Sequence, residues 1–171
     1  MGTLLFLCLG EEDNFPMKNV ITAHFVACTR EEVDVKYPTP KQILLPRRGT
    51  PRSAGYDFYS PYEVIIPPHQ SVFFPAWVKC IDMPLDAVLK IYIRSSLGIK
   101  KGLCLSNGTG IIDSDYVWGI GVSIYNRSEQ EVKIEEGERF AQGIFEHYLI
   151  TADDAPIENE RVGGFGSTGK K

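Results

Sequence analysis

Short runs of β-branched and aromatic residues recur along this sequence, and they constrain its fold more than any other feature. Seven runs have the length and composition of strands: residues 20–28, 62–66, 71–74, 88–93, 122–125, 132–134 and 140–150. Proline, glycine, asparagine and aspartate separate the runs and favour turns. Because strands do not alternate with helices and no segment repeats, the sequence predicts an all-β barrel or jelly roll.

Two segments favour a helix instead. Residues 94–101 begin with Ser95 and Ser96 in a plausible capping position, and residues 30–35 are a charged stretch that suits a turn or a short helix. Neither forms the crossover of a strand–helix–strand unit. We therefore expect any nucleotide to be held by loops of a β framework.

Length and charge narrow the functional classes. A chain of 171 residues that is 43% hydrophobic can bury one sizeable core, which predicts one domain. A formal net charge of −4 argues against a broad nucleic-acid surface, although a few local basic residues could hold a small polyphosphate. The four cysteines lack zinc-site spacing and are expected to be reduced thiols: Cys8, Cys28, Cys80 and Cys104.

The first residues do not resemble a membrane segment. The apolar run from Thr3 to Leu9 is too short to span a bilayer and lacks the basic region of a secretory signal. We therefore expect a cytoplasmic protein that does not bind membranes. We interpret residues 1–16 as an N-terminal extension, residues 17–160 as the β domain and residues 161–171 as a C-terminal arm.

The C-terminal arm has the composition of a nucleotide lid. Its glycines permit close backbone approach to a ligand, Arg161 suits phosphate, and Phe165 offers a stacking surface. A disordered, solubilising tail is the alternative. Residues 164–170 also fit the phosphate-loop pattern G-x-x-x-x-G-K, but Lys171 stands where that pattern requires serine or threonine, and no buried strand immediately precedes the glycines.

Three further polar segments stand at expected strand ends. Residues 54–60 (AGYDFYS) surround Asp57 with apolar positions, and an edge strand with a solvated acid is the alternative. Residues 93–98 (IRSSLG) combine Arg94 with two hydroxyls and backbone N–H groups, which suits phosphate, although a surface helix cap fits too. Residues 137–142 (GERFAQ) offer a neutral amide and an arginine that could serve as a structural charge partner.

A fourth segment, residues 107–116 (NGTGIIDSDY), carries a hairpin signal followed by two acids. Asp113 and Asp115 could bind a metal or provide a general base. On a strand they would point to the same face, whereas at an irregular strand end only one would reach a ligand. The amide of Asn107 could read the edge of a base.

In this order, the five segments resemble the motifs of the homotrimeric dUTPase family, the deoxyuridine triphosphate nucleotidohydrolases. The resemblance covers about residues 17–171. It implies a jelly-roll β-barrel with a flexible glycine-rich C-terminal arm, assembled as a homotrimer with an active site at each subunit interface. It also implies hydrolysis of dUTP to dUMP and pyrophosphate, with Mg²⁺ held through substrate phosphates and water rather than by direct protein ligands.

The resemblance assigns a role to each motif residue. Asp113 would activate the water that attacks the α-phosphorus, with Asp115 secondary or structural, and Asp57 would support the metal–water network. The remaining residues would bind substrate: Arg94, Ser95, Ser96 and Gln142 at the phosphates, Asn107, Gly110 and Ile112 at uracil, Tyr116 against the deoxyribose, and Arg161, Phe165, Gly166, Ser167 and Thr168 in the closing arm.

Two positions depart from the family pattern. One residue fewer separates Arg161 from Phe165, and Trp118 lies where the family often has a small-residue turn, so its indole would pack at an interface or reshape the loop beside the sugar. A dCTP deaminase of the same superfamily is the nearest alternative enzyme. A regulatory protein that uses this fold to bind another macromolecule is the alternative of a different class.

Overall fold

The structure, a computed structural model, describes residues 20–155, 161, 163 and 164. The expected N-terminal extension and the arm residues Phe165, Gly166, Ser167 and Thr168 lie outside the described residues. The elements of the described part are β1 (His24–Ala27), η2 (Arg30–Glu32), β2 (Arg47–Arg48), β3 (Tyr56–Tyr59), β4 (Val64–Ile66), β5 (Ser71–Pro75), β6 (Val78–Ile81), β7 (Ala87–Ile93), η3 (Ser96–Lys100), β8 (Leu103–Leu105), β9 (Gly110–Ile112), β10 (Gly121–Asn126), β11 (Val132–Ile134) and β12 (Arg139–His147).

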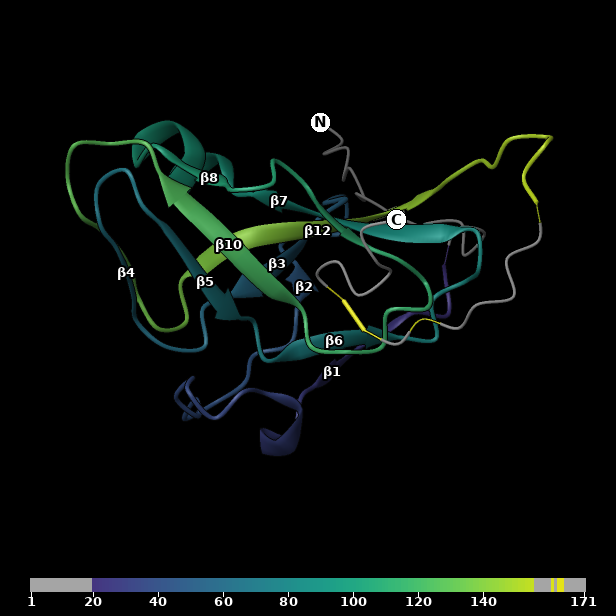
Figure 1. Ribbon diagram of the computed structural model, residues 1–171, viewed down its shortest axis with the longest axis horizontal. Coiled ribbons are helices and arrows are strands. Elements are labelled where there is room, and N and C mark those ends of the chain that lie inside the picture. The colour runs from purple at the N-terminus through teal and green to yellow at the C-terminus, as the bar shows by residue number, and fades with distance from the viewer. Residues whose placement is uncertain (1–19, 156–160, 162, 165–171) are drawn as a thin grey trace, which may run out of the picture.

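The strands of the described residues form four antiparallel sheets around one main core, and a small second cluster contains Cys28, Val33 and Trp77. The largest has the order β2-β3-β12-β7-β9, the second has the order β5-β10-β8, and the pairs β1-β6 and β11-β4 complete the barrel. In the view of Figure 1, β10 crosses in front of β12. Phe74 of β5 and Phe140 of β12 have ring centroids 5.1 Å apart, so the two main sheets bury their inner faces against each other. The predicted all-β jelly-roll class is confirmed.

The side chains of β10 and β12 have the pattern and sizes that packing of the two sheets requires. Side chains of β10 alternate between buried and partly buried positions, as the strand period of two requires. In β12, a Cβ on Gly143 would come within 2.8 Å of the Phe58 ring and 2.9 Å of Leu89. Glycine therefore allows the central strand to approach its core neighbours closely.

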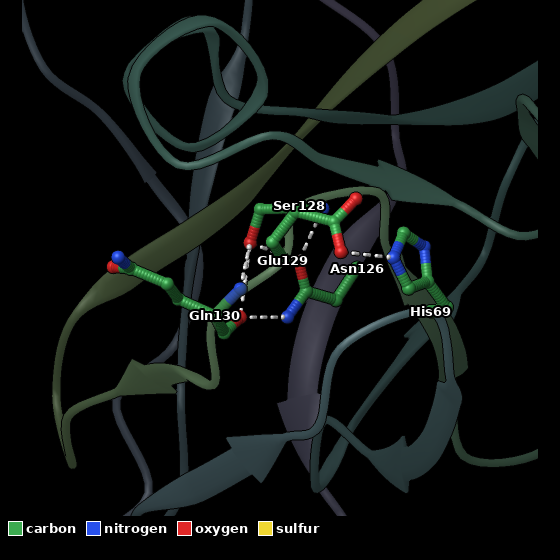
Figure 2. Close-up of polar contacts among 5 residues, drawn as sticks. All are labelled: His69, Asn126, Ser128, Glu129 and Gln130. Carbon is green, nitrogen blue, oxygen red and sulfur yellow. Dashed lines mark hydrogen bonds and ion pairs between the residues drawn. The ribbon is translucent and has the colours of Figure 1, made fainter.

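The predicted turn after β10 is fixed by one buried amide. Asn126 donates to a carbonyl of β4 (2.9 Å) and to the carbonyl of Gln130 (2.7 Å), and its oxygen accepts bonds from the backbone (2.9 Å) and hydroxyl (2.8 Å) of Ser128. Beside this amide, His69 Nε2 lies 3.0 Å from Glu129 Oε2 (Figure 2). Every polar atom of this buried amide is thus satisfied, which ties β11 and β4 to β10.

Each of the seven predicted runs contains an observed strand, β3 lies in the segment for which an edge strand was only the alternative, and four short strands, β2, β6, β8 and β9, were missed. The hairpin predicted at Asn107 is wrong, because β8 pairs with β10 whereas β9 pairs with β7. The turn, with Gly108 at φ 76°, instead passes the chain from one sheet to another. Both predicted helical segments form short turns, but the Ser95 side chain makes no capping bond.

The described cysteines are free thiols. Cys28 and Cys80 are buried, and burial raises the pKa of each to about 11, so both stay protonated at neutral pH. Cys104 is partly exposed. No helix in the described part of the chain has the length and apolar character needed to cross a membrane.

Candidate active site

Three of the singled-out segments meet in one pocket on the largest sheet. Because β3 and β7 flank β12, Asp57 lies opposite Gln142, which lies opposite Tyr92 at the end of β7. Arg94 follows two residues later. The resulting cavity, here called the Asp57 pocket, measures about 470 Å³ and is lined by Gly49, Thr50, Ser53, Ala54, Gly55, Asp57, Arg94, Ser95, Arg139, Gln142 and Ile144.

Two arginines share the single carboxylate of this pocket. Asp57 is 8% exposed, and one of its oxygens forms an ion pair with Arg94 Nε at 3.0 Å while the other accepts a hydrogen bond from Arg139 Nη1 at 3.0 Å. The interpretation of Asp57 as a solvated edge-strand acid is therefore wrong, since β3 lies between β2 and β12. Two cations against one anion leave the Asp57 pocket with net positive charge, which suits an anionic ligand.

Hydroxyl and amide groups complete the lining. A Cβ on Gly55 would come within 2.8 Å of Gln142 Oε1, so this glycine makes room for the amide. Thr50 and Ser53 hydroxyls hydrogen-bond each other at 2.8 Å beside the pocket. Sequence analysis missed these two hydroxyls, because their segment was interpreted only as a turn. Ser96, which was grouped with Ser95, is not among the lining residues.

A second group of predicted residues lies after β9. Asp113, Asp115, Tyr116 and Trp118, together with Arg161, are here called the Asp113 cluster. The backbone N–H of Tyr116 donates to the carbonyl of Asp113 at 3.0 Å, which closes a turn. Arg161 donates from Nη2 to Asp113 at 2.5 Å and from Nε to Asp115 at 2.7 Å. One guanidinium thus bridges both acids.

The Tyr116 ring is held on several sides. Its hydroxyl donates to the Gly119 carbonyl at 2.9 Å, and the edge of the ring meets Trp118 at a centroid distance of 5.5 Å. The guanidinium carbon of Arg161 lies 6.0 Å from the ring centroid, and Gly164 lies against the ring. Burial raises the pKa of Tyr116, which keeps its hydroxyl protonated as a donor. Trp118 remains 38% exposed, so its indole borders the cluster.

The two groups lie at opposite ends of one strand. In the antiparallel pairing of β9 with β7, Ile112 faces Leu89, so Asp113 follows toward Val88. Six residues of extended chain separate Val88 from Arg94, which places the Asp113 end about 20 Å from the arginine. Asn107, Gly110, Ile112 and Tyr116 are likewise absent from the lining of the Asp57 pocket. One chain therefore presents two separate half-sites.

Comparisons with known proteins bear on the family of this chain. The sequence profile of the dUTPase family matches residues 41–169. This chain belongs to the dUTPase family. The deoxyuridine 5′-triphosphate nucleotidohydrolase of Lactococcus lactis is 39% identical over 145 residues, which cover 81% of this chain and 95% of the relative. The family prediction made from the five segments is confirmed.

Solved dUTPase structures share the fold. That of the Streptococcus mutans dUTPase superposes with a TM-score of 0.62 at 34% identity, covering 74% of this chain and 97% of that one. A point variant of the dUTPase from phage phi11 of S. aureus, described with a structural Mg(II) ion, has a TM-score of 0.61 at 20% identity and covers 81% of this chain and 97% of the phage chain. The second likeness concerns the fold alone.

The described residues offer a metal ion one carboxylate in the Asp57 pocket. No group of three or more histidine, cysteine, aspartate or glutamate side chains gathers for a metal among the described residues. Asp57 is the carboxylate that lines the Asp57 pocket, and its oxygens form ion pairs with two arginines. Mg²⁺ commonly keeps several waters and binds substrate phosphates, so Asp57 is suited to accept hydrogen bonds from metal-bound water.

Proposed function

We propose that this chain is a dUTP diphosphatase that hydrolyses dUTP to dUMP and pyrophosphate. The observation that carries the proposal is the Asp57 pocket, where two guanidinium groups, the Ser95 hydroxyl and the Gln142 amide converge in a net positive cavity. Such groups match the charge and hydrogen-bonding needs of a triphosphate. Family membership and the name of the Lactococcus lactis relative support the same substrate.

In this proposal Asp113 is the general base. Its carboxylate is 48% exposed and can therefore meet a water molecule once Arg161 leaves. Asp113 takes a proton from that water as the water oxygen bonds to the α-phosphorus, and the bond from this phosphorus to the bridging oxygen breaks. Pyrophosphate leaves with that oxygen, and Arg94 with the pocket hydroxyls offsets its charge. Mg²⁺ would supply further charge neutralisation at the phosphates.

The nucleoside would occupy the Asp113 end. The Tyr116 ring, fixed by Gly119 and Trp118, offers a rigid wall against which a deoxyribose packs and a ribose 2′-hydroxyl finds no partner. Asn107 and the backbone at Gly110 and Ile112 would read the uracil edge. Phe165 would stack on the base, and Gly166, Ser167 and Thr168 would close on the phosphates with Arg161.

The separation of the half-sites supports an assembly in which one active site uses two chains. Asp113 and Arg94 of a single chain, about 20 Å apart, cannot act on the same phosphate group. A closed ring of identical subunits would bring the Asp113 end of one chain to the Asp57 pocket of the next. We therefore propose a homotrimer whose arms close neighbouring sites, as the family resemblance implies.

The cellular role follows from the reaction. Removing dUTP would limit uracil incorporation into DNA, and the dUMP produced would feed dTMP synthesis. The cytoplasmic location stays a prediction from the sequence, as does the division into residues 1–16, 17–160 and 161–171.

The decisive experiment is pyrophosphate release from dUTP with Mg²⁺, run beside dCTP, dTTP and UTP while ammonia is monitored. We expect dUTP cleavage without ammonia and little cleavage of the other three nucleotides. Ammonia release from dCTP would identify a deaminase instead. No turnover of any nucleotide by a folded protein would contradict the proposal and favour a regulatory binding role.

A further inference from the structure

Arg161 lies on the residues that the proposed reaction needs to be accessible. Its guanidinium bridges Asp113 and Asp115, and only 19% of its side chain is exposed. Gly164 lies against the Tyr116 ring so closely that a Cβ would meet Cε2 at 2.5 Å. Two residues of the C-terminal arm thus cover the candidate base and the candidate sugar wall of their own chain.

This arrangement differs from the one required during hydrolysis. The Asp113 oxygen that accepts from Arg161 is engaged by a cation, whereas a general base must accept from water. A sugar packed on Tyr116 would also need the space beside Gly164. The described contacts therefore belong to a substrate-free state, and Arg161 must leave before hydrolysis.

Asp115 binds a different nitrogen of Arg161 from the one that Asp113 binds. The reaction needs one base, yet two carboxylates hold the guanidinium, and each accepts from a different nitrogen. Asp115 takes the Nε bond at 2.7 Å, which fixes the direction of the planar group while Nη2 reaches Asp113. Two bonds from a planar guanidinium define one orientation, whereas one bond would leave it free to rotate.

We propose that Asp115 is a positioning residue that holds Arg161 over Asp113 of the same chain between turnovers, and that the triphosphate of a substrate in the neighbouring site, which this arm closes, draws Arg161 away. The inference rests on the proposed function for the identity of the substrate, for the role of Asp113 as the base and for arms that close neighbouring sites. Phosphate oxygens carry more negative charge than the two carboxylates and bind guanidinium bidentately, so an incoming triphosphate competes directly for Arg161. Nucleotide binding at one site is thereby coupled to exposure of the base at the adjacent site, which the departing arm had covered.

Trypsin cleavage tests the substrate-free contact, because trypsin must bind the Arg161 side chain to cut the bond to Val162. We expect Asp115→Asn to speed loss of residues 162–171 about fivefold in ligand-free protein, the scale of one partly exposed ion pair. Asp115→Glu should restore slow cleavage. Asp154→Asn is the matched control, because it removes the same charge shortly before Arg161 in the sequence from a side chain without an ion pair among the described residues. Equal cleavage of Asp115→Asn and wild type would overturn the proposal.

Kinetics test the coupling to substrate. Asp115→Asn should lower the KM for dUTP severalfold, because substrate no longer displaces Arg161 from two carboxylates. The same substitution should have no effect on KM in an Arg161→Gln background, because that variant lacks the guanidinium that Asp115 holds. An undiminished effect in that background would assign Asp115 a different role. Cleavage is measured without nucleotide, so a chain that protects Arg161 but does not hydrolyse dUTP would refute the proposed function and leave the positioning contact standing.

Discussion

Three neighbouring strands hold the Asp57 pocket, whereas one turn and two arm residues hold the Asp113 cluster. In the pocket, strand register sets Asp57 opposite Gln142, and the positions do not depend on any chain end. In the cluster, Tyr116 depends on Gly119, Trp118 and Gly164 for its orientation. The two regions therefore differ in rigidity. The sheet provides a fixed anion site, and the turn carries Asp113, which Arg161 can cover or expose. Substitutions in the two regions should therefore fail in different ways.

The largest loss of activity should follow from removing the Asp113 carboxylate in the turn after β9. Asp113→Asn keeps the size of the side chain but cannot accept a proton, so kcat for dUTP should fall by about a thousandfold, within the usual range for a general base. Nucleotide binding and circular dichroism should change little. The measurement is single-turnover pyrophosphate release beside equilibrium binding of a non-hydrolysable analogue, and near-normal turnover would reject Asp113 as the base.

Loss of the arm should come next. A chain ending at residue 160 lacks Arg161 and all groups proposed to close over the substrate, so kcat/KM should fall about a hundredfold through poorer positioning. The thermal unfolding midpoint should stay close to that of the full chain, because the strands remain. Unchanged hydrolysis would show that Asp113 acts without closure by residues 161–171.

The strand-held pocket should respond in stability as well as activity. Asp57→Asn leaves Arg94 and Arg139 facing each other without their shared anion, which should cost about 2 kcal/mol of unfolding free energy. Urea unfolding at one fixed protein concentration measures this. Asp86→Asn is the control, because its pair with His147 is well exposed and should cost less than about 0.5 kcal/mol. Equal losses would show that the pocket is no more rigid than the surface.

The smallest effect should be at Trp118. Removing its edge-to-face contact with Tyr116 by Trp118→Ala should reduce discrimination between dUTP and UTP about fivefold, the value of one aromatic pair, and Trp118→Phe should restore most of it. The only other tryptophan, Trp77, is 1% exposed, so acrylamide quenching of fluorescence reports on Trp118. Unaltered discrimination in Trp118→Ala would favour the interface role for this indole.

Sequence alone predicted the all-β class and singled out several residues that the structure places in the Asp57 pocket or the Asp113 cluster, because strand composition and short motifs are local properties. It could not predict that Arg94 and Arg139 share Asp57, since that contact depends on the register of three strands. The failed hairpin at Asn107 has the same origin. Its turn signal was correct, but a turn does not specify which strands pair on either side.

The length of β7 has a genetic consequence. Since Asp113 and Arg94 lie at opposite ends of this strand, a ring of subunits would assemble each active site from the Asp113 end of one copy and the arginine of another. Two inactive alleles, Asp113→Asn and Arg94→Ala, should then complement each other when expressed together. Some mixed rings would join the intact half of one mutant subunit to the intact half of its neighbour, and a cell carrying both alleles would regain activity that neither allele provides alone.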